Sequence, residues 1–511
     1  MRRFVSTLAI FAVLAQGPMV ASAQEQAERQ APVRQGLCAP LAPLPRLAPE
    51  SQQQNQVKPR PGPMTRKSAA YPSAPPPPPP SAPPPPAEAV ADRAAPVAAA
   101  AVESGGEESA EIVTTASRRE SDAWAPTMPY PGPRPGPRPR PRPQPQSGLL
   151  TAGEHDDLLN PELYASYVRR SNLGQEIRAL PHLDTGRVLT VTVRDDAGRP
   201  VPFARVELAC ADGNSLAFNT LADGTVAFFP EVDRLGSKVR VRAGGEAWRD
   251  VTIAQGRGGQ RVDFTVGQQA QPARKLDLML VVDTTGSMGD EISYLQSELA
   301  AILSSLRQRH PGLDLRIGFV FYRDLGDDYV TSTVPLTGDF SAAQGALRQQ
   351  YASGGGDYPE AMEQALIRAA GQQWRGDAVH TMLLVADAPP HDENFAATWL
   401  AARHLRASRV QIVPVAASGV ADKAEYAMRA MAALTQSRYT FLTDDSGIGN
   451  PHAAPAIDCY LVTRLDALLR RVIDSQLSGR RIEPDKQEVI RSVGQYDNGR
   501  CIIPPGGLQE Q

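Results

Sequence analysis

Beyond its first residues, the chain of 511 residues contains no long apolar run. A bilayer-spanning helix needs about 18 or more consecutive apolar residues, so we expect no membrane span once an N-terminal signal has been removed. An excess of basic residues is also missing, because 53 Lys and Arg face 56 Asp and Glu and the formal net charge is -3. This balance gives no electrostatic reason for binding nucleic acid or an anionic membrane.

Three motifs of common hydrolases and nucleotide-binding enzymes are absent: H-E-x-x-H, G-x-S-x-G and the phosphate loop G-x-x-x-x-G-K-[ST]. Ser287 lies within Thr-Gly-Ser-Met-Gly, which lacks the first glycine of the esterase motif. We therefore expect a protein that is not an enzyme. Hydrolysis assisted by a bound metal stays as a minor alternative.

Cysteine is scarce, and none of the four residues Cys38, Cys210, Cys459 and Cys501 stands at the C-x-x-C spacing of a metal site. Four cysteines allow three pairings, and the sequence does not choose among them. We favour Cys459 with Cys501, a bond that would join the C-terminal tail, 480–511, to the last domain. Disulfides of this kind need an oxidising compartment.

The N-terminus has the three parts of a secretory signal peptide, which we place at residues 1–23. Two arginines follow the first residue, an apolar stretch comes next, and Ala21-Ser22-Ala23 offers a small-x-small cleavage site. We therefore expect an exported protein that is periplasmic, associated with the cell envelope or secreted.

Residues 24–150 are rich in proline and poor in large apolar residues, so they cannot bury enough surface to offset the entropy of ordering. We expect a disordered stalk, with polyproline II helix in its two proline runs at 75–86 and 129–145. The simplest role is a spacer between the folded domains and an anchor point. The alternative is contact with a cell-wall polymer or a proline-binding groove through the second run, where arginines alternate with prolines.

Residues 151–184 are interpreted as a short helical bridge. Asn160-Pro161-Glu162 combines an N-cap, a first-turn proline and an acidic first turn, which predicts a helix to about Ser171. The acidic stretch 153–157 is a candidate for cation binding, but we expect a solvated linker there.

Residues 185–268 contain several short stretches in which apolar and polar side chains alternate, separated by glycine-containing turns. This pattern is typical of β-strands, and about seven of them in about 80 residues predict a small all-β sandwich. The stretches 193–202 and 220–224 resemble the carboxypeptidase regulatory-like, or transthyretin-like, module. That resemblance implies a structural spacer rather than an enzyme.

Residues 275–479 change to alternating strands and helices, a pattern that predicts a doubly wound, Rossmann-like α/β domain. Leu276–Val282 is a nearly continuous apolar run, as in a central parallel strand, and apolar residues recur at helical spacing in the next segment, Asp290–Arg309. Further strands are expected at 313–321, 329–334, 381–386, 411–416 and 439–442, and further helices at 341–351, 359–370, 395–406, 424–435 and 465–477. We expect helices on both faces of an open sheet, with ligands bound beyond the carboxyl ends of its strands.

Asp283 stands where the first strand of this domain ends, and Thr285 and Ser287 follow at alternate positions of a glycine-containing turn. One carboxylate and two hydroxyls on a tight loop are hard oxygen ligands. Such ligands suit one divalent cation, for which we put Mg2+ first, with Mn2+ or Ca2+ as alternatives.

The stretch Asp283-Thr284-Thr285-Gly286-Ser287 resembles the metal ion-dependent adhesion site of von Willebrand factor A (VWFA) domains. Three later stretches, 317–324, 354–361 and 383–389, agree with bacterial members in order and spacing. The resemblance implies ligands from three loops, with Asp283, Thr285 and Ser287 in the first and Asp387 in the third. In the second loop many members have a threonine, whereas this chain has Gly356-Asp357-Tyr358, so Asp357 is our candidate there.

Three carboxylates, from Asp283, Asp357 and Asp387, would leave a site with one dication at a formal charge of about -1. That charge should hold the metal tightly and discourage an acidic partner. The resemblance implies a protein that binds or assembles with a protein ligand through its metal site. The alternative is a structural spacer of the cell envelope whose metal stabilises the fold. His391 and Asp392, which follow the third loop, are expected to be exposed loop residues.

Overall fold

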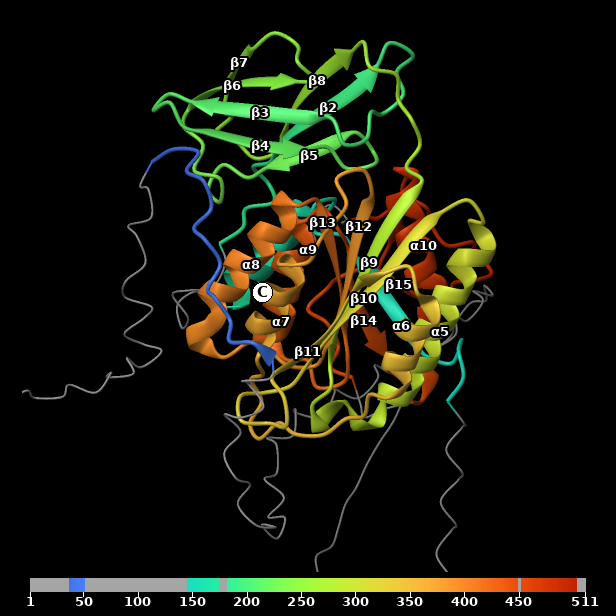
Figure 1. Cartoon of the computed structure of the whole chain (residues 1–511). Coiled ribbons are helices and arrows are strands. Elements are labelled where there is room, and N and C mark those ends of the chain that lie inside the picture. Colours follow the sequence, from blue (N-terminus) through green and yellow to red (C-terminus); the bar gives the residue numbers. More distant parts are fainter. Residues whose placement is uncertain (1–35, 51–144, 172, 174–181, 449–451, 503–511) are drawn as a thin grey trace, which may run out of the picture. The chain divides into compact units, whose positions relative to one another are not determined.

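The computed structural model describes residues 36–50, 145–171, 173, 182–448 and 452–502 (Figure 1). The predicted signal peptide and most of the predicted stalk lie outside these ranges. None of the helices in the described ranges is long and apolar enough to cross a membrane. All of these described residues lie in the same compact unit.

Nine strands of the described chain form one sheet, in the order β11-β10-β9-β12-β13-β14-β1-β15-β16 (Figure 1). In that order their bounds are Thr331–Thr337, Asp314–Tyr322, Lys275–Asp283, Val379–Ala386, Val410–Ala416, Tyr439–Thr443, Thr151–His155, Tyr460–Arg464 and Arg491–Val493. Strands β10, β9, β12, β13 and β14 are parallel, whereas β11, β1, β15 and β16 pair antiparallel with their neighbours. The predicted α/β fold with a parallel central sheet is confirmed.

The central strands are buried because their sequences are almost continuously apolar. Every residue of β9 except Lys275 is buried, and β12 is buried throughout. The charged residue inside β9, Asp277, accepts hydrogen bonds from Arg316 Nε at 2.9 Å and Arg375 Nε at 2.8 Å. These contacts satisfy its carboxylate near the amino end of the strand, whereas Asp283 lies at the carboxyl end.

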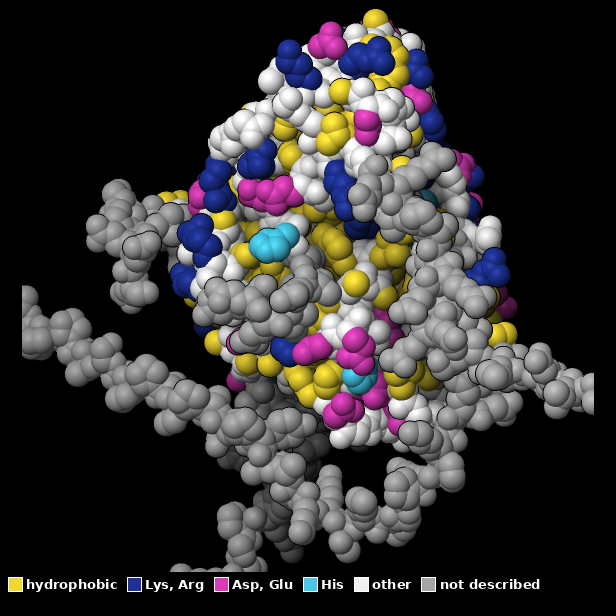
Figure 2. Space-filling model, turned by 90° about the vertical axis from the view of Figure 1, so that its left-hand side faces the viewer, with side chains coloured by type: hydrophobic (Ala, Val, Ile, Leu, Met, Phe, Trp, Pro, Cys, Tyr) yellow, Lys and Arg dark blue, Asp and Glu magenta, His cyan; other side chains and the backbone are white. Residues whose placement is uncertain are grey.

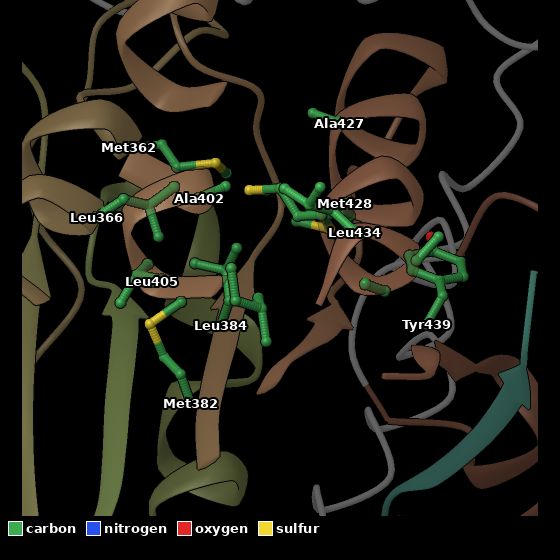
Figure 3. Packing of buried hydrophobic residues seen from close by; sticks show 14 of the residues in the cluster. Met362, Leu366, Met382, Leu384, Ala402, Leu405, Ala427, Met428, Leu434 and Tyr439 are labelled. Atoms are coloured by element: carbon green, nitrogen blue, oxygen red, sulfur yellow. The ribbon is translucent and has the colours of Figure 1, made fainter. Parts of the chain in front are cut away.

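Helices cover both faces of this sheet (Figure 1). Their bounds are α5 Ile292–Arg309, α6 Phe340–Arg348, α7 Met362–Ala370, α8 Phe395–Ala407, α9 Asp422–Leu434 and α10 Leu465–Ser478. Helices α7, α8 and α9 share a hydrophobic core with Met279 and Val281 of β9, and α5, α6 and α10 share another with Leu278 and Leu280. Side chains of a strand alternate between its faces, so β9 contributes to both cores. Figure 3 shows the first core, where α7, α8 and α9 meet β12.

The prediction of a solvated linker at 153–157 is wrong. Residues 151–155 form strand β1, which lies between β14 and β15 and pairs antiparallel with both. All five residues are buried between these two strands, and the charge of Glu154 is offset by ion pairs with Arg438 and Arg471, each at 2.7 Å. The helix predicted after it, α3, runs from Pro161 to Ser171 as expected.

Part of the predicted C-terminal tail, 480–511, pairs with the same sheet. Its strand β16 pairs with β15, and a short hairpin follows from β17 (Tyr496–Asp497) and β18 (Arg500–Cys501). The predicted Cys459–Cys501 disulfide is present, and Cys38 is bonded to Cys210. Both bonds fit a protein that folds in an oxidising compartment.

The segment 189–266 is all-β, and its seven strands form two sheets ordered β5-β2-β8 and β4-β3-β6-β7. The bounds are β2 Leu189–Asp195, β3 Arg205–Cys210, β4 Ser215–Asn219, β5 Thr225–Phe228, β6 Lys238–Ala243, β7 Arg249–Thr252 and β8 Gln260–Val266. Buried residues of both sheets, such as Val191 and Leu208, belong to one hydrophobic core. Because β1 precedes this segment and β9 follows it, the segment is an insertion between two strands of the α/β sheet.

Residues 36–50 belong to the stretch predicted to be disordered, and for them that prediction is wrong. The Cys38–Cys210 disulfide joins them to β3. Further along, Glu50 Oε1 accepts a hydrogen bond from Thr333 Oγ1 at 2.6 Å, on the edge strand β11. A covalent bond and specific polar contacts thus order a segment whose composition alone predicts disorder.

Candidate metal centre

Three loops meet at the carboxyl ends of β9 and β12, where this class of fold binds ligands. The first loop follows β9 and contains the short helix η1 (Gly286–Asp290), the second precedes α7, and the third follows β12. Backbone hydrogen bonds join them, since Gly286 N donates to Gly354 O at 3.1 Å and Glu360 N donates to Pro389 O at 3.0 Å. The loops are therefore fixed relative to one another by the backbone itself.

The first loop folds around the Asp283 carboxylate. Its Oδ1 accepts hydrogen bonds from Thr285 N at 2.9 Å and Thr285 Oγ1 at 2.7 Å, and Thr285 Oγ1 lies 3.1 Å from Ser287 Oγ. Asp283 and Thr285 are buried, whereas Ser287 is exposed. Asp283 Oδ2 has no hydrogen-bond partner among the described residues. The structure thus brings together the three residues predicted from this loop, and the buried Tyr322 hydroxyl lies close enough to the Asp283 carboxyl to lower its pKa.

The third loop contributes Asp387 directly after β12. Its side chain is 2% exposed, and its Oδ1 also has no hydrogen-bond partner within the described ranges. The Ser287 hydroxyl lies close enough to the Asp387 carboxyl to lower its pKa, so the first and third loops approach each other at these two side chains.

The electrostatics of these two carboxyls are unfavourable without a positive charge. Burial raises the pKa of Asp283 to about 6. Burial together with the negative charge of Asp283 raises the pKa of Asp387 to about 8. A divalent cation would offset both charges and occupy the unused oxygens, and hard oxygen ligands of this kind suit Mg2+. The residues present therefore fit a divalent cation.

The family that matches this part of the chain is described as von Willebrand factor A domain, and the match covers residues 277–450. This segment is a von Willebrand factor A (VWA) domain. The match begins in β9 and includes all three loops, so the candidate metal centre lies inside the VWA domain. The strand β1, the inserted all-β segment and the tail lie outside the matched residues.

Two curated proteins share a stretch of sequence with the chain. The chain is 29% identical over 124 residues to the alpha-protein kinase vwkA of Dictyostelium discoideum, and the aligned region covers 24% of this chain and 19% of that protein. It is 33% identical over 122 residues to the ariadne-like RING finger protein R811 of Acanthamoeba polyphaga mimivirus, which covers 23% and 12%. The chain thus spans less than a fifth of either relative, and the kinase and RING finger of their names are properties of those proteins.

Two solved structures are similar over part of the chain. One is the conserved hypothetical protein BatB from Bacteroides thetaiotaomicron, with 11% identity and a TM-score of 0.27 over 39% of this chain and 98% of that one. The other is the pilus adhesin SpaC from Lactobacillus rhamnosus GG in its open conformation, with 14% identity and a TM-score of 0.30 over 47% and 31%. At these values the likeness carries no argument about function.

In the second loop of the VWA domain the carboxyl turned inward is not the predicted one. The Asp357 side chain is exposed, whereas Glu360 is 2% exposed and its Oε2 has no hydrogen-bond partner in the described chain. Burial and then the charge of Asp283 raise the pKa of Glu360 to about 10. Asp357 as a metal ligand stays a prediction. Glu360 was missed, although a glutamate three residues after Asp357 and just before α7 was a signal in the sequence.

Two histidines pair with acidic groups that follow strands β9, β10 and β14. His391 Nε2 is 2.8 Å from Asp324 Oδ1, and His452 contacts Glu291 at 2.7 Å and Asp444 at 2.8 Å. Burial lowers the pKa of both imidazoles, but hydrogen bonds to the carboxylates outweigh burial, so both pKa values are raised. His391 is therefore partly buried and paired rather than an exposed loop residue. Figure 2 shows acidic side chains gathered around a histidine on the face that it draws.

A separate group of His155, Cys459 and Cys501 has the side-chain types and proximity of a metal site. The two cysteines are bonded to each other, which removes the thiolates that a metal would need. His155 Nδ1 lies 3.3 Å from Cys459 O. This group therefore connects β1 with the tail and is not a second metal centre.

Proposed function

We propose that the protein is exported and binds a protein partner through a divalent cation, Mg2+ in the first place, held by its VWA domain. The observation that supports this is the pair of buried carboxylate oxygens, Asp283 Oδ2 and Asp387 Oδ1, that have no hydrogen-bond partner among the described residues. Buried polar atoms are nearly always satisfied in proteins. Two such carboxyl oxygens on adjoining loops therefore support the proposal of a positive ligand between them.

In this proposal Asp283, Thr285, Ser287 and Asp387 hold the cation, with Mn2+ or Ca2+ as alternatives to Mg2+. When bound, the cation supplies a positively charged binding position for an oxygen atom of the partner. Asp283 orients Thr285 through two hydrogen bonds to one oxygen. Because Ser287 is exposed whereas Asp283 and Asp387 are buried, a partner would approach the cation over the first loop.

We further propose that residues 189–266, whose two sheets share one core, are a β-sandwich of the carboxypeptidase regulatory-like kind. In this proposal the proline-rich segment separates the folded part from its anchor point. Both disulfides support export, because such bonds persist in oxidising compartments.

Retention of a partner by immobilised full-length protein tests the proposal. Envelope proteins of the producing organism are applied in Mg2+ or in EDTA, to wild type, to Asp387→Ala and to a control, Asp392→Ala. The control removes the exposed carboxylate of Asp392, which pairs with Lys423 at 3.0 Å and is not one of the proposed metal ligands. We expect at least one protein to be retained by wild type and control in Mg2+ and released by EDTA, and not to be retained by Asp387→Ala.

Retention that is the same in EDTA and with Asp387→Ala would contradict the proposal. Binding of Mg2+ without any retained protein would favour the alternative in which the metal only stabilises the fold.

A further inference from the structure

The second loop carries a buried carboxyl that the ligand set above leaves without a role. A Cβ atom built on Gly355 would lie 2.9 Å from Glu360 Oε1 and 3.4 Å from Thr285 Cβ. The Glu360 carboxyl is thus beside the first loop, next to the threonine whose hydroxyl contacts Asp283 and Ser287. Its other oxygen, Oε2, is buried without a hydrogen-bond partner among the described residues.

The backbone of the second loop is shaped to bring this carboxyl inward. Gly355 has φ of +70°, in the left-handed region that favours glycine, and a Cβ there would displace the end of the Glu360 side chain from its present position. Asp327 Oδ2 accepts a hydrogen bond from Gly355 N at 2.7 Å, and Glu360 N donates to Pro389 O at 3.0 Å. These contacts fix Glu360 between the first and third loops.

No cation of the described chain forms an ion pair with Glu360. The neighbouring Arg323 is engaged elsewhere, because its Nη1 lies 3.4 Å from Asp328 Oδ2. His391 is engaged by Asp324 at 2.8 Å. Glu360 can ionise in this interior only if a positive charge lies close by. A cation held by the first and third loops is the charge that the arrangement offers.

We infer that Glu360, rather than Asp357, is the second loop's ligand to the cation, and that the site takes a neutral oxygen, such as a backbone carbonyl, from its partner. This inference rests on the proposed function. Three carboxylates around one dication leave a formal charge of about -1. An aspartate or glutamate of a partner would be repelled by that charge, whereas a carbonyl oxygen would not.

Calorimetric titration of Mg2+ into the full-length chain tests the ligand assignment. The variants are Glu360→Gln and a matched control, Asp357→Asn, which removes the exposed carboxylate three residues earlier. We expect Glu360→Gln to weaken Mg2+ binding by at least about tenfold and Asp357→Asn to change it by less than about twofold. An equal effect of the two variants, or a larger effect of Asp357→Asn, would overturn the inference.

The outcomes separate this inference from the proposed function. Wild type that binds no Mg2+ rejects both. Binding that is lost in Asp387→Ala but unchanged in Glu360→Gln overturns the inference alone. Thermal melting in EDTA shows whether the variant folds, and we expect Glu360→Gln to melt at or above the wild-type temperature because it removes an unpaired buried carboxyl. A Glu360→Gln variant that unfolds without metal would show a structural role and contradict the inference.

The partner's chemistry is tested with acetate, the simplest carboxylate, titrated into the Mg2+-loaded full-length protein. Removing one negative charge should let the cation accept acetate, so we expect Glu360→Gln to bind it at least about threefold more tightly than wild type. Equal acetate binding by the two proteins would overturn the charge argument.

Discussion

Replacing Asp387 with asparagine should stabilise the metal-free protein and abolish its stabilisation by Mg2+. Burial and the charge of Asp283 raise the pKa of Asp387 from 3.8 to about 8 in the folded protein, whereas the unfolded chain ionises this carboxyl near the lower value. Between these two pH values the unfolded state binds fewer protons than the folded state, so the metal-free protein loses stability as the pH rises. Asparagine cannot ionise and removes this loss.

The size of the effect follows from the pKa difference. One unit corresponds to about 1.4 kcal/mol, which sets an upper limit of about 6 kcal/mol at pH 8. Water entry and side-chain movement lower the cost of a buried charge, so we expect a gain of about 1–3 kcal/mol for Asp387→Asn at pH 8 and a smaller gain at pH 5. For wild type, Mg2+ at about one hundred times its dissociation constant adds about 2.7 kcal/mol. The variant should gain almost nothing from Mg2+.

Urea unfolding of the full-length chain at pH 5 and pH 8, in EDTA and in Mg2+, measures both effects. Trp374 and Trp399 pack against a core of the α/β domain, so tryptophan fluorescence follows its unfolding. The exposed Asp392→Asn is the control and should behave as wild type. Lower stability of Asp387→Asn than wild type in EDTA at pH 8, or an equal gain from Mg2+ in both, would refute the reasoning.

Further predictions concern β1. Glu154→Gln should lower the free energy of unfolding by about 3–5 kcal/mol, because it weakens the buried ion pair with Arg438, and a wild-type urea midpoint would speak against this. Burial opposes ionisation of Glu154 and Asp157, but the charges of buried arginines outweigh it and lower both pKa values to about 2. The stabilising effect of the two ionised carboxylates is therefore complete above about pH 4.5 and is lost as the pH falls toward 2. A melting temperature that stays constant from pH 6 to about pH 2.5 would contradict this expectation. A fragment that starts at Lys275 lacks β1, which lies between β14 and β15, so we expect it not to fold, whereas a chain that starts at residue 145 should fold. Circular dichroism distinguishes the two outcomes. A cooperatively folded Lys275 fragment would show that β1 is dispensable.

The positions of the two loops that carry Asp283 and Asp387 were predictable because each follows a buried parallel strand directly. Asp283 ends β9 and Asp387 follows β12, and a continuous apolar run shows where such a strand ends. Once the strand ends are known, the fold class places these side chains at one edge of the sheet. Local pattern and topology therefore determine where these two aspartates of the proposed metal centre lie.

Strand β1 was not predictable from its own residues. Gly153, Glu154 and His155 form no apolar pattern, and Glu154 is buried because Arg438 and Arg471 stand 284 and 317 residues later in the chain. Ion pairs between such distant segments leave no periodic signal in the sequence.

The spacing of residues in the sequence likewise does not determine whether Asp357 or Glu360 is the buried carboxyl of the second loop. The inward turn of Glu360 depends on the left-handed conformation at Gly355 and on a backbone hydrogen bond to Pro389. These contacts join different loops, so the sequence shows the presence of both carboxylates and not which of them is buried.

The central claim is that the VWA domain binds a divalent cation through Asp283 and Asp387, and its most direct test is calorimetric titration of Mg2+ into the full-length protein. The account predicts saturable binding near one site that is lost in Asp283→Ala and in Asp387→Ala and kept in Asp392→Ala. Absence of binding in wild type, or binding that survives both substitutions, would contradict it.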